Sequence, residues 1–543
     1  MPKYLVFLGI LLLFSGCRSV RHLKQETTAF KKAFDSSKVH LTAQDRLSQS
    51  PHGNWQLQVQ GNPFELGYKR GVLTKDLYQF QEKAFFQQVE TFIPKPGRQR
   101  FLIKFLKWYL RDILEDIPLP YRQEIFGLSR VANQDFDWVG SKYERALLLH
   151  GAHDIGHALQ DLMLVGCSSV ALWDQYTEDG QLLIGRNFDF YINADFAKHK
   201  LVEFVKPAEG YQYAAVSWPG MIGVVSGMNE KGLSISINAS KSNIPLKGKT
   251  PISLVSRSIL QHAQNIEEAI ALAKTFDVFI AESLLIGSAQ DNRAVSIEIS
   301  PKNFDVYEVG NGILFCTNHF QSTNYSKDKR NNAHRLETHS QYRLEKLHEL
   351  FPKAKPYNQI EVAQHLRDIS GLQGKDIGLG NEKSLNQLMA HHAVIFKPGS
   401  LHMWVSNSPY QLGAFDAYDL KAIFEQQQAA EPDAKLTIPA DSLIHSPLFQ
   451  NYRHFKQLKP QIERAIQTKK ELPNDLCHNF EQLNPNLWLT HSLLGDYYYS
   501  QKDWEKALHY YEIAGSKEIS SDKNRKNLDK KRLKAKKKYD SSH

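Results

Sequence analysis

The chain has 543 residues, of which 42% are hydrophobic and 11% aromatic, so it can bury a large core and has room for more than one domain. The formal net charge is +9, but much of the excess lies between Lys523 and Lys538, and no zinc, recognition-helix or aromatic RNA-reading motif accompanies it, so nucleic-acid binding is not expected. Four scattered cysteines, at positions 17, 167, 316 and 477, exclude a disulfide framework, and without a CxxC pair they favour no zinc site.

The N-terminus has the pattern of a bacterial export signal. Lys3 precedes an apolar run over residues 4–14, which is too short to span a bilayer as a mature helix. Residues 14–17 then resemble a lipoprotein processing box, so we expect Cys17 to be lipidated and to anchor the protein in the membrane of the cell envelope, facing the periplasm or the exterior. Plain secretion and an uncleaved anchor are the alternatives. Residues 1–17 are thus the expected signal peptide, and the polar segment 18–50 is the expected tether.

Residues 51–166 carry helical spacing and predict a helical N-terminal segment. Its clearest helix, 99–118, places Lys104, Lys107 and Arg111 on one face among aromatic residues. Such a helix could lie on a membrane surface, but a core helix with one solvated side is the simpler interpretation. On a further expected helix, His153 and His157 lie four residues apart. Because no third ligand or HExxH pattern joins them, we expect no metal.

From residue 167 onwards, short runs rich in Val, Ile and Leu predict strands. They cover residues 169–173, 182–184, 201–205, 213–218, 223–226, 233–238, 283–286, 294–299, 305–309 and 313–317, with a closing hairpin at 393–396 and 403–405. Helices are expected near 265–270 and 341–350. This order favours an α+β fold of two packed sheets with helices outside. We expect the main domain to cover 167–412 and a helical linker to cover 413–485.

The C-terminal part contains the spacing of one tetratricopeptide (TPR) unit at 486–520. Gly495, Tyr498, Ala507, Tyr511 and Ala514 follow that repeat's pattern. Since about three repeats are needed for a free-standing solenoid, we expect this unit to pack on the main domain or to cap a helical pair. Binding of a partner protein is the alternative. The basic end, 521–543, is expected to be a solvated helix or tail, with contact to acidic lipid as its alternative.

The most informative string is Gly166-Cys167-Ser168-Ser169, followed by Gly185-Arg186-Asn187-Phe188-Asp189. Each string lies on a strand-like run, and two adjacent strands would bring a thiol, a cation and a carboxylate together. A cation favours the thiolate, which is the nucleophilic form of cysteine. The alternative is a buried cysteine beside a structural Arg186–Asp189 pair.

These strings resemble the N-terminal-nucleophile hydrolases that cut linear amides. The chain is most similar to the family of acyl-coenzyme A:6-aminopenicillanic acid acyltransferase, which is related to bile salt hydrolase, penicillin V acylase and acid ceramidase. Four further motifs agree in the family's order: the glycine signature at 61–71, a Met-Asn-Glu-Lys-Gly-Leu string at 228–233, Thr-Asn-His-Phe at 317–320, and Ser-x-x-Arg at 340–343. The resemblance implies a four-layer αββα sandwich and no cofactor.

The resemblance also implies a self-activating mechanism. The bond between Gly166 and Cys167 would be cut by the chain itself, so that the thiol and a free α-amine share one residue. Arg186 would favour the thiolate and Asp189 would bind the amine. The substrate would be a small N-acyl compound, cleaved through a thioester.

Three further residues complete the implied site. Asn318 is the first candidate donor to the oxyanion and Asn238 is the second, while Arg343 would brace the site, with Arg335 as its competitor. The structural alternatives are a loop cap for Asn318, a strand-end turn for Asn238 and a surface cation for Arg343. Two other functions stay open: a non-catalytic lipid-anchored protein that binds partners through its C-terminal helices, and a papain-type thiol hydrolase.

Overall fold

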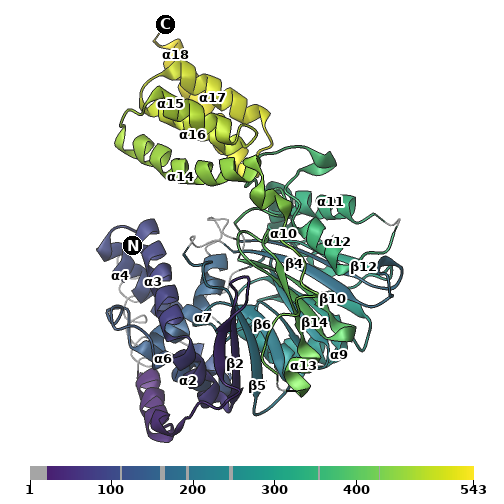
Figure 1. Cartoon of the computed structure of the whole chain (residues 1–543). Helices are drawn as coiled ribbons and strands as arrows, with labels where there is room; N and C mark the ends of the chain where they lie inside the picture. Colours follow the sequence, from purple (N-terminus) through teal and green to yellow (C-terminus); the bar gives the residue numbers. More distant parts are fainter. Residues whose placement is uncertain are drawn as a thin grey trace.

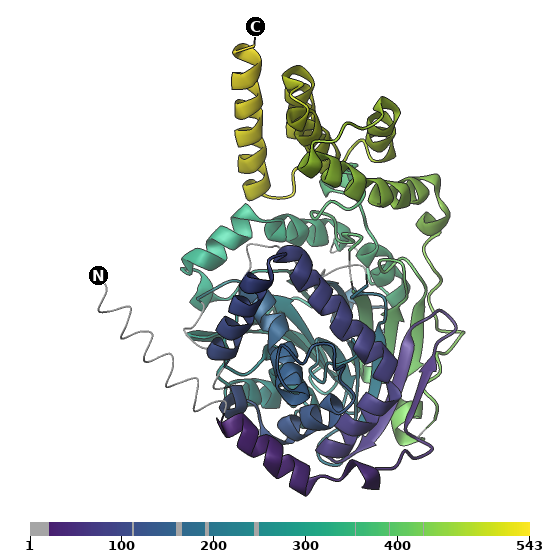
Figure 2. The ribbon, with the colours of Figure 1, turned by 90° about the vertical axis from the view of Figure 1, so that its left-hand side faces the viewer.

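Two β-sheets and the helices around them make up most of the molecule, a mixed α/β fold (Figure 1). The computed structural model describes residues 21–110, 113–158, 165–190, 195–243, 249–352, 355–389, 391–426 and 428–542. The described residues begin in a helix over 21–33 and end in a helical unit that stands apart from the sheets (Figures 1 and 2). Cys17 lies outside the described residues.

The first sheet has nine strands in the order β1-β2-β5-β6-β7-β8-β9-β10-β11. All its pairs are antiparallel except β2 with β5. Its strands are β1 (Arg46–Gln49), β2 (Trp55–Gly61), β5 (Leu201–Pro207), β6 (Tyr213–Ser217), β7 (Ser226–Asn229), β8 (Leu233–Ala239), β9 (Glu282–Ser288), β10 (Arg293–Ser300) and β11 (Asn303–Tyr307).

The second sheet has six antiparallel strands in the order β12-β3-β4-β13-β14-β15. They are β3 (Val165–Leu172), β4 (Leu183–Phe190), β12 (Ile313–Cys316), β13 (His392–Lys397), β14 (His402–Ser406) and β15 (Phe415–Asp419). Every strand predicted from the sequence corresponds to one of these strands, except 223–226, where the chain reaches β7 only at Ser226.

The helices of the main body are α2 (Pro63–Leu73), α3 (Lys75–Phe92), α4 (Pro96–Tyr109), α5 (Ile113–Asp116), α6 (Leu119–Ser129), α7 (Lys142–Ala158), α8 (Ile252–His262), α9 (Ile266–Ala273), α10 (Lys329–Glu337), α11 (Ser340–Leu350), α12 (Gln359–Leu366) and α13 (Leu420–Glu425). The C-terminal unit consists of α14 (Pro447–Thr468), α15 (Asn474–Leu483), α16 (Trp488–Ser500), α17 (Trp504–Ser516) and α18 (Asp522–Asp540).

Three apolar cores hold the sheets and the main-body helices together. One core joins side chains of both sheets, such as Ile184 and Val394 with Val202 and Leu285, so the sheets pack face to face. On the other face of the nine-stranded sheet, a second core contains residues of α2, α6 and α8. On the other face of the six-stranded sheet, a third core contains residues of α11 and α12. Figure 1 shows α2 and α6 to one side of the strands and α11 and α12 to the other.

The glycine signature at 61–71 has a packing explanation. α2 starts with a capping box, in which the side chain of Asn62 accepts from Glu65 N and the Glu65 side chain accepts from Asn62 N. Gly67 faces α6 so closely that a Cβ would lie 1.8 Å from the carbonyl oxygen of Glu124. Gly127 of α6 makes the reciprocal approach, with its Cβ position 2.5 Å from the carbonyl oxygen of Phe64. The signature therefore allows two helices to touch backbone to backbone.

The expectation of a tether over 18–50 is wrong for the described part of that segment. The helix over 21–33 buries Phe30, whose ring lies 5.3 Å from that of Phe126, and Phe34 stacks on Phe64 at 4.6 Å. The two phenylalanines are four residues apart, so they share one helical face and attach the segment to α2 and α6.

Two predicted boundaries also differ from the structure. Residues 51–166 are not wholly helical, because β2 joins the nine-stranded sheet in parallel pairing with β5. The boundary at 412 cuts the six-stranded sheet, because β15, inside the expected helical linker 413–485, pairs with β14 along its whole length.

The helix expected at 99–118 ends at Tyr109, and it is not a core helix, since Phe101 is 73% and Phe105 42% exposed. None of the described helices is long and apolar enough to cross a bilayer.

The apolar core of the C-terminal unit also takes in Leu379, Leu388 and Leu412, which precede α14, so the unit packs against the main body. A Cβ at Gly495 would lie 2.5 Å from the ring of Tyr511, so α16 and α17 pack closely at the residues that suggested a TPR unit. The expected basic tail is largely the helix α18, with Leu528 and Ala535 buried. The unit contacts the main body through Glu518, whose carboxylate lies 2.6 Å from Lys383 Nζ.

Candidate active site

The ladder between β3 and β4 arranges the predicted site. Cys167 lies opposite Phe188, Ser169 opposite Arg186, and Gly166 opposite Asp189. Directly opposed residues point to the same face of a sheet, and successive residues point to opposite faces. The side chains of Cys167 and Arg186 therefore face the nine-stranded sheet, while that of Asp189 faces the helix α11.

The thiol of Cys167 is fully buried against a guanidinium. Arg186 Nη2 lies 3.8 Å from Sγ, and Nη1 of the same residue donates to the carbonyl of Val225 at 2.8 Å and to Ser226 Oγ. The carbonyl of Ile237 accepts a further hydrogen bond from Nη2. Burial raises the pKa of the Cys167 thiol, and the charge of Arg186 is the strongest opposing influence. The sulfur is therefore held next to a cation, while burial favours its protonated form.

The backbone of Cys167 is held as firmly as its sulfur. Its N–H donates to Asn318 Oδ1 at 2.9 Å, and its carbonyl accepts from Arg343 Nη1. The same Arg343 nitrogen donates to Ser168 Oγ at 2.7 Å, and Arg343 Nη2 donates to Asn318 Oδ1. Among the described residues, Arg343 thus contacts Cys167, and Arg335 does not.

Asp189 lies on the α11 side of the ladder, in a fully buried position. Burial raises the pKa of its carboxyl group to about 7, although Arg343, the hydrogen bond from Gln411 and Arg186 act in the opposite direction. Gln411 Nε2 lies 3.5 Å from Oδ1, and Oδ2 has no hydrogen-bond partner among the described residues. The carboxylate can therefore accept one more donor, and it lies directly across from Gly166.

Gly166 is the tightest point of the site. A Cβ there would lie 2.4 Å from Nε2 of Gln387, a fully buried side chain. Gln387 stands in a segment without regular secondary structure and belongs to no motif, so no sequence signal could have identified it. Its contact explains why no side chain fits at residue 166.

Asn238 comes close to the site but serves a neighbouring residue. Its Nδ2 donates to Ser169 Oγ at 3.0 Å and to the carbonyl of Cys316 at 3.2 Å. The structure thus brings five of the predicted residues onto Cys167 or its immediate surroundings, namely Gly166, Arg186, Asp189, Asn318 and Arg343. Asn238, on β8, instead contacts Ser169, two residues after Cys167 on β3. The side chains of His153 and His157 lie outside the described set.

Two buried histidines behind Arg186 were not predicted as site residues. Ser226 Oγ, which accepts from Arg186, lies 2.9 Å from His392 Nε2, and His392 Nδ1 lies 2.9 Å from His391 Nδ1. His392 pairs with Phe188 in the ladder between β4 and β13. Only this strand pairing, which no local pattern reveals, brings the two histidines beside Arg186.

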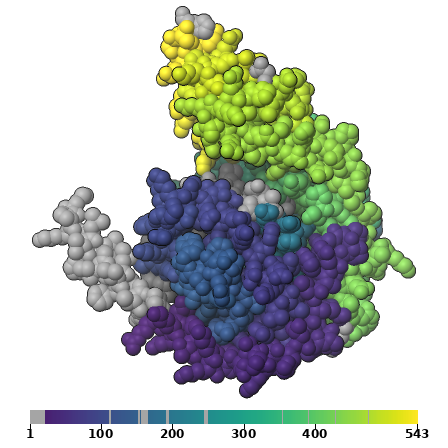
Figure 3. Space-filling view, turned by 60° about the vertical axis from the view of Figure 1, so that its left-hand side comes forward, coloured from purple at the N-terminus to yellow at the C-terminus, as the bar shows by residue number. Residues whose placement is uncertain are grey.

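An aromatic cavity opens beside this arrangement. It measures about 480 Å³, open solvent included, and its lining contains Tyr78, Phe85, Phe190, Phe196 and Trp218. The ring of Phe190 stacks on that of Phe188 at 5.6 Å, so the cavity begins next to the aromatic neighbour of Cys167. Figure 3 shows a hollow between the blue surface of the N-terminal helices and the yellow-green C-terminal unit.

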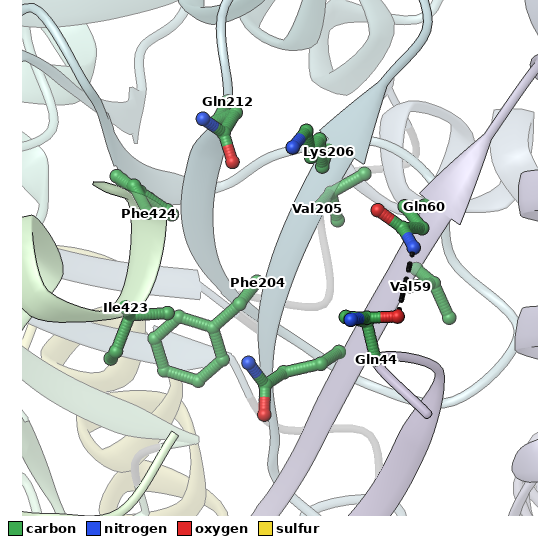
Figure 4. Close-up of a pocket in the computed structure, with 10 residues that line it drawn as sticks. Gln44, Val59, Gln60, Phe204, Val205, Lys206, Gln212, Ile423 and Phe424 are labelled. Carbon is green, nitrogen blue, oxygen red and sulfur yellow. Dashed lines mark hydrogen bonds between the residues drawn. The ribbon is translucent and has the colours of Figure 1, made fainter. Parts of the chain in front are cut away.

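A second cavity, of about 380 Å³, lies away from the thiol (Figure 4). It is lined by four glutamines and by Lys206, and Gln60 Nε2 reaches Gln44 Oε1 at 3.5 Å. It shares no residue with the candidate site.

Comparison with known proteins supports the family resemblance. Residues 176–381 match the model of the acyl-coenzyme A:6-aminopenicillanic acid acyl-transferase family. Arg186, Asp189, Asn238, Asn318 and Arg343 lie inside the matched segment, and Cys167 precedes it. The resemblance inferred from the motifs is thereby confirmed.

The individual relatives and solved structures have low sequence identity to this chain. An uncharacterized protein of Archaeoglobus fulgidus is 25% identical over 278 residues, which cover 47% of this chain and 45% of that protein. Protein dcd1B of Dictyostelium discoideum is 24% identical over 45% of this chain and 50% of its own length. The chain therefore spans about half the length of these curated relatives.

Among solved structures, a Caenorhabditis elegans N-acylethanolamine-hydrolyzing acid amidase ortholog has a TM-score of 0.32, with 18% identity, covering 43% of this chain and 93% of its own. A mutant of the conjugated bile acid hydrolase from Clostridium perfringens has a TM-score of 0.30, with 12% identity, covering 49% and 94%.

Proposed function

We propose that this protein is a self-processing cysteine amidase that cleaves the linear amide bonds of N-acyl compounds through a thioester on Cys167. One observation carries the proposal: the N–H, the carbonyl and the sulfur of Cys167 contact three different motif side chains. Asn318 accepts from the N–H, Arg343 donates to the carbonyl, and Arg186 lies against Sγ. A cysteine that only filled the core would need none of these contacts.

The first step of the proposal is self-cleavage. Sγ attacks the carbonyl carbon of Gly166, the C–N bond to Cys167 breaks, and the thiol proton ends on the departing nitrogen. Water then hydrolyses the thioester, which leaves a carboxylate on Gly166 and a free α-amine on Cys167. The carboxylate of Asp189, across the ladder from Gly166 and with one oxygen unpaired among the described residues, suits the role of receiving that amine.

Turnover would follow the same chemistry on an external amide. The free α-amine, with an ordinary pKa near 8, takes the thiol proton, and the thiolate attacks the amide carbonyl. The amide of Asn318 is the first candidate for stabilising the oxyanion, with Asn238 as the second. The leaving amine departs, and water resolves the thioester. We propose hydrolysis rather than synthesis, since acyl-coenzyme A is not expected outside the cytoplasm.

The aromatic cavity gives the proposal an acyl-binding site. Its side chains Phe190, Phe196 and Trp218 would bury apolar atoms of a substrate next to Phe188, on the face of β4 that carries Arg186. Residues up to 166 would have to withdraw from the sulfur after cleavage, because Cys167 is fully buried in the uncleaved chain.

The proposal includes three finer statements about architecture and location. The two sheets and their flanking helices would form the four-layer αββα sandwich, α16 and α17 would be a TPR-like pair, and Cys17 would carry the lipid anchor. A papain-type mechanism is less well supported, because no histidine in the described part of the chain hydrogen-bonds to the sulfur, while Arg186 does. A non-catalytic partner-binding protein is the alternative if the chain never cleaves itself.

The test is to purify the mature protein and to determine its chains by intact mass and N-terminal sequencing. We expect two chains, the second beginning at Cys167, and we expect Cys167→Ala to remain in one piece. Cys316→Ala is the matched control, because it removes another buried thiol from a neighbouring strand of the same sheet and should leave cleavage intact. A wild-type protein that is active as a single uncut chain contradicts the proposal.

A further inference from the structure

We propose that His391 forms a polar subsite behind the aromatic wall of the cavity, with its Nε2–H donating a hydrogen bond to a neutral oxygen, hydroxyl or carbonyl, on the acyl group of the substrate. The inference rests on the proposed amidase function and adds the chemical class of acyl group that the site selects. It comes from a series of side chains linked by hydrogen bonds, Arg186, Ser226, His392 and His391. Each hydrogen bond in the series determines where the next proton lies.

The proton positions follow from what each group can do. Arg186 can only donate, so Ser226 Oγ accepts from it. A hydroxyl oxygen can accept twice, so the assignment rests on the one proton of Ser226: among the described residues, His392 Nε2, at 2.9 Å, is the acceptor within its reach. Both imidazoles are neutral near pH 7, because burial lowers the pKa of His391 to about 3 and that of His392 well below its usual value.

A neutral imidazole carries one proton, and this determines which nitrogen of each histidine is protonated. Because His392 Nε2 accepts, the proton of His392 is on Nδ1 and is donated to His391 Nδ1, 2.9 Å away. The proton of His391 must then be on Nε2. That atom is buried, and it has no hydrogen-bond partner in the part of the chain that the structure describes. The result is a buried N–H donor whose partner is missing.

The surroundings of this donor indicate where a partner would come from. The His391 ring lies 5.5 Å from the ring of Trp218 and 6.4 Å from that of Phe196, and both aromatic residues line the cavity. His391 lies behind them and is not itself a lining residue, so a ligand would reach its Nε2 once one of these rings turns aside. Aromatic rings offer no strong acceptor, and the two acceptor side chains of the lining, Gln81 and Glu82, make no hydrogen bond to His391 Nε2. Lys200, whose Nζ donates to the carbonyl of Ser406 at 2.7 Å, is a second donor nearby, and burial lowers its pKa to about 7. An incoming group should therefore be an acceptor rather than a donor.

The distance between His391 and the sulfur of Cys167 indicates which part of the substrate His391 would contact. Cys167, Phe188 and His392 form one row across β3, β4 and β13. Neighbouring strands lie about 4.8 Å apart, so His392 is roughly 10 Å from the level of Cys167. Since His391 adjoins His392, its donor would meet an oxygen several bonds away from the scissile carbonyl, on the acyl chain.

The first experiment tests the proton position without any substrate. In the full-length protein labelled with ¹⁵N-histidine, and with His391→Phe to assign the signals, we expect Nε2 of His391 to be the protonated nitrogen and Nδ1 the bare one. The opposite tautomer, or a charged ring, would overturn the proposal.

The second experiment tests the subsite by binding. Straight-chain alkanoates from hexanoate to dodecanoate and their ω-hydroxy analogues are added to the same labelled protein. We expect the Nε2–H signal to move with a hydroxylated ligand and not with its plain partner. A signal that responds to neither set means that the donor meets an internal water only, and the proposal fails. A response that only the shared carboxylate explains also counts against it.

The third experiment uses turnover. We expect wild type to hydrolyse an ω-hydroxyalkanoyl aminocoumarin amide with a kcat/KM about tenfold above that of the plain alkanoyl amide, mainly through KM. His391→Phe should bring the ratio of the two kcat/KM values to about one, whatever its effect on the plain substrate, while His391→Gln, which keeps an N–H, should retain part of the preference. An equal preference in wild type and His391→Phe refutes the subsite. If neither amide is cleaved although the binding experiment succeeds, the amidase function fails and the subsite stands.

Discussion

The two faces of the β3–β4 ladder carry different parts of the candidate site. On the face toward the nine-stranded sheet lie the sulfur of Cys167 and Arg186, followed by Ser226 and the two histidines. On the face toward α11 lie Asp189 and Arg343, together with the Gln387 side chain that fills the space next to Gly166.

The difference between the faces indicates how one cysteine would serve both reactions of the proposed function, self-cleavage and amide hydrolysis. The first face acts on the charge of the sulfur, through a guanidinium that opposes the effect of burial on the thiol pKa. The second face holds the main chain, through Arg343 on the carbonyl of Cys167 and the narrow space at Gly166. We therefore expect changes on the α11 face to affect self-cleavage most, and changes on the sulfur face to affect nucleophilicity most.

The largest effect is expected from Arg343→Gln, on the α11 face. The change removes the donors to the carbonyl of Cys167, to Ser168 Oγ and to Asn318 Oδ1. Each buried acceptor left unpaired costs about 1–3 kcal/mol, and the geometry around the scissile bond is lost. We expect no cleavage on a denaturing gel, and a lower free energy of unfolding in urea when both proteins also carry Cys167→Ala.

Arg335→Gln is the control for this prediction. It removes a guanidinium from α10 that makes none of the described contacts to Cys167, so cleavage should proceed normally. If Arg343→Gln cleaves itself at the wild-type rate, the α11 face does not position the scissile bond.

Arg186→Gln, on the sulfur face, should act on reactivity more than on cleavage. A nearby opposite charge typically lowers a pKa by about 1–3 units, so the processed variant should need a correspondingly higher pH to react with iodoacetamide. Labelling of Cys167→Ala defines the background from Cys316 and Cys477. We expect self-cleavage to be slow but complete, in contrast to Arg343→Gln. An unchanged alkylation profile would show that Arg186 does not control the thiol.

The sequence predicted nearly every strand after residue 165, because short runs rich in Val, Ile and Leu mark strands locally. Cys167, Arg186, Asn318 and Arg343 lie in short motifs and were predicted mainly through the family resemblance of those motifs; the structure brings them together, and their catalytic roles stay predictions. The strand β2 was missed, because it lies next to a region with strong helical spacing and gains its pairing from β5, far along the chain. His391 and Gln387 were missed for the same reason: only long-range contacts bring them to the site.

Asp189→Asn tests the charge on the α11 face through the pH dependence of stability. The folded-state pKa of Asp189 is about 7, above its usual 3.8. Between pH 3.8 and pH 7 the folded chain therefore keeps a proton on Asp189 that the unfolded chain has released. Stability from this group is therefore present at low pH and lost as pH rises toward 7, by roughly 1.4 kcal/mol per pH unit at most.

The measurement uses the Cys167→Ala background, in which the chain stays whole. We expect Asp189→Asn to flatten the loss of unfolding free energy between pH 5 and pH 7, because the amide does not ionise. In the processed enzyme the same change should abolish turnover, since the amide cannot pair with the cationic amine. If stability falls equally in both proteins, Asp189 is already ionised in the uncleaved chain.

The smallest effect is expected from Glu518→Gln, which tests whether the C-terminal unit supports the α11 face. Glu518 pairs with Lys383 at 2.6 Å and Lys375 at 3.2 Å, and both lysines flank the segment that leads to Gln387. The carboxylate is partly exposed, so its loss should cost about 0–1 kcal/mol, and the carbonyl of Glu518 keeps its hydrogen bond from Asn381. We expect the rate of self-cleavage to be unchanged, with Lys517→Gln as a neighbouring control. A cleavage rate that falls severalfold only in Glu518→Gln would mean that the helical unit is part of the apparatus that holds Gly166, and the division into two faces would have to include it.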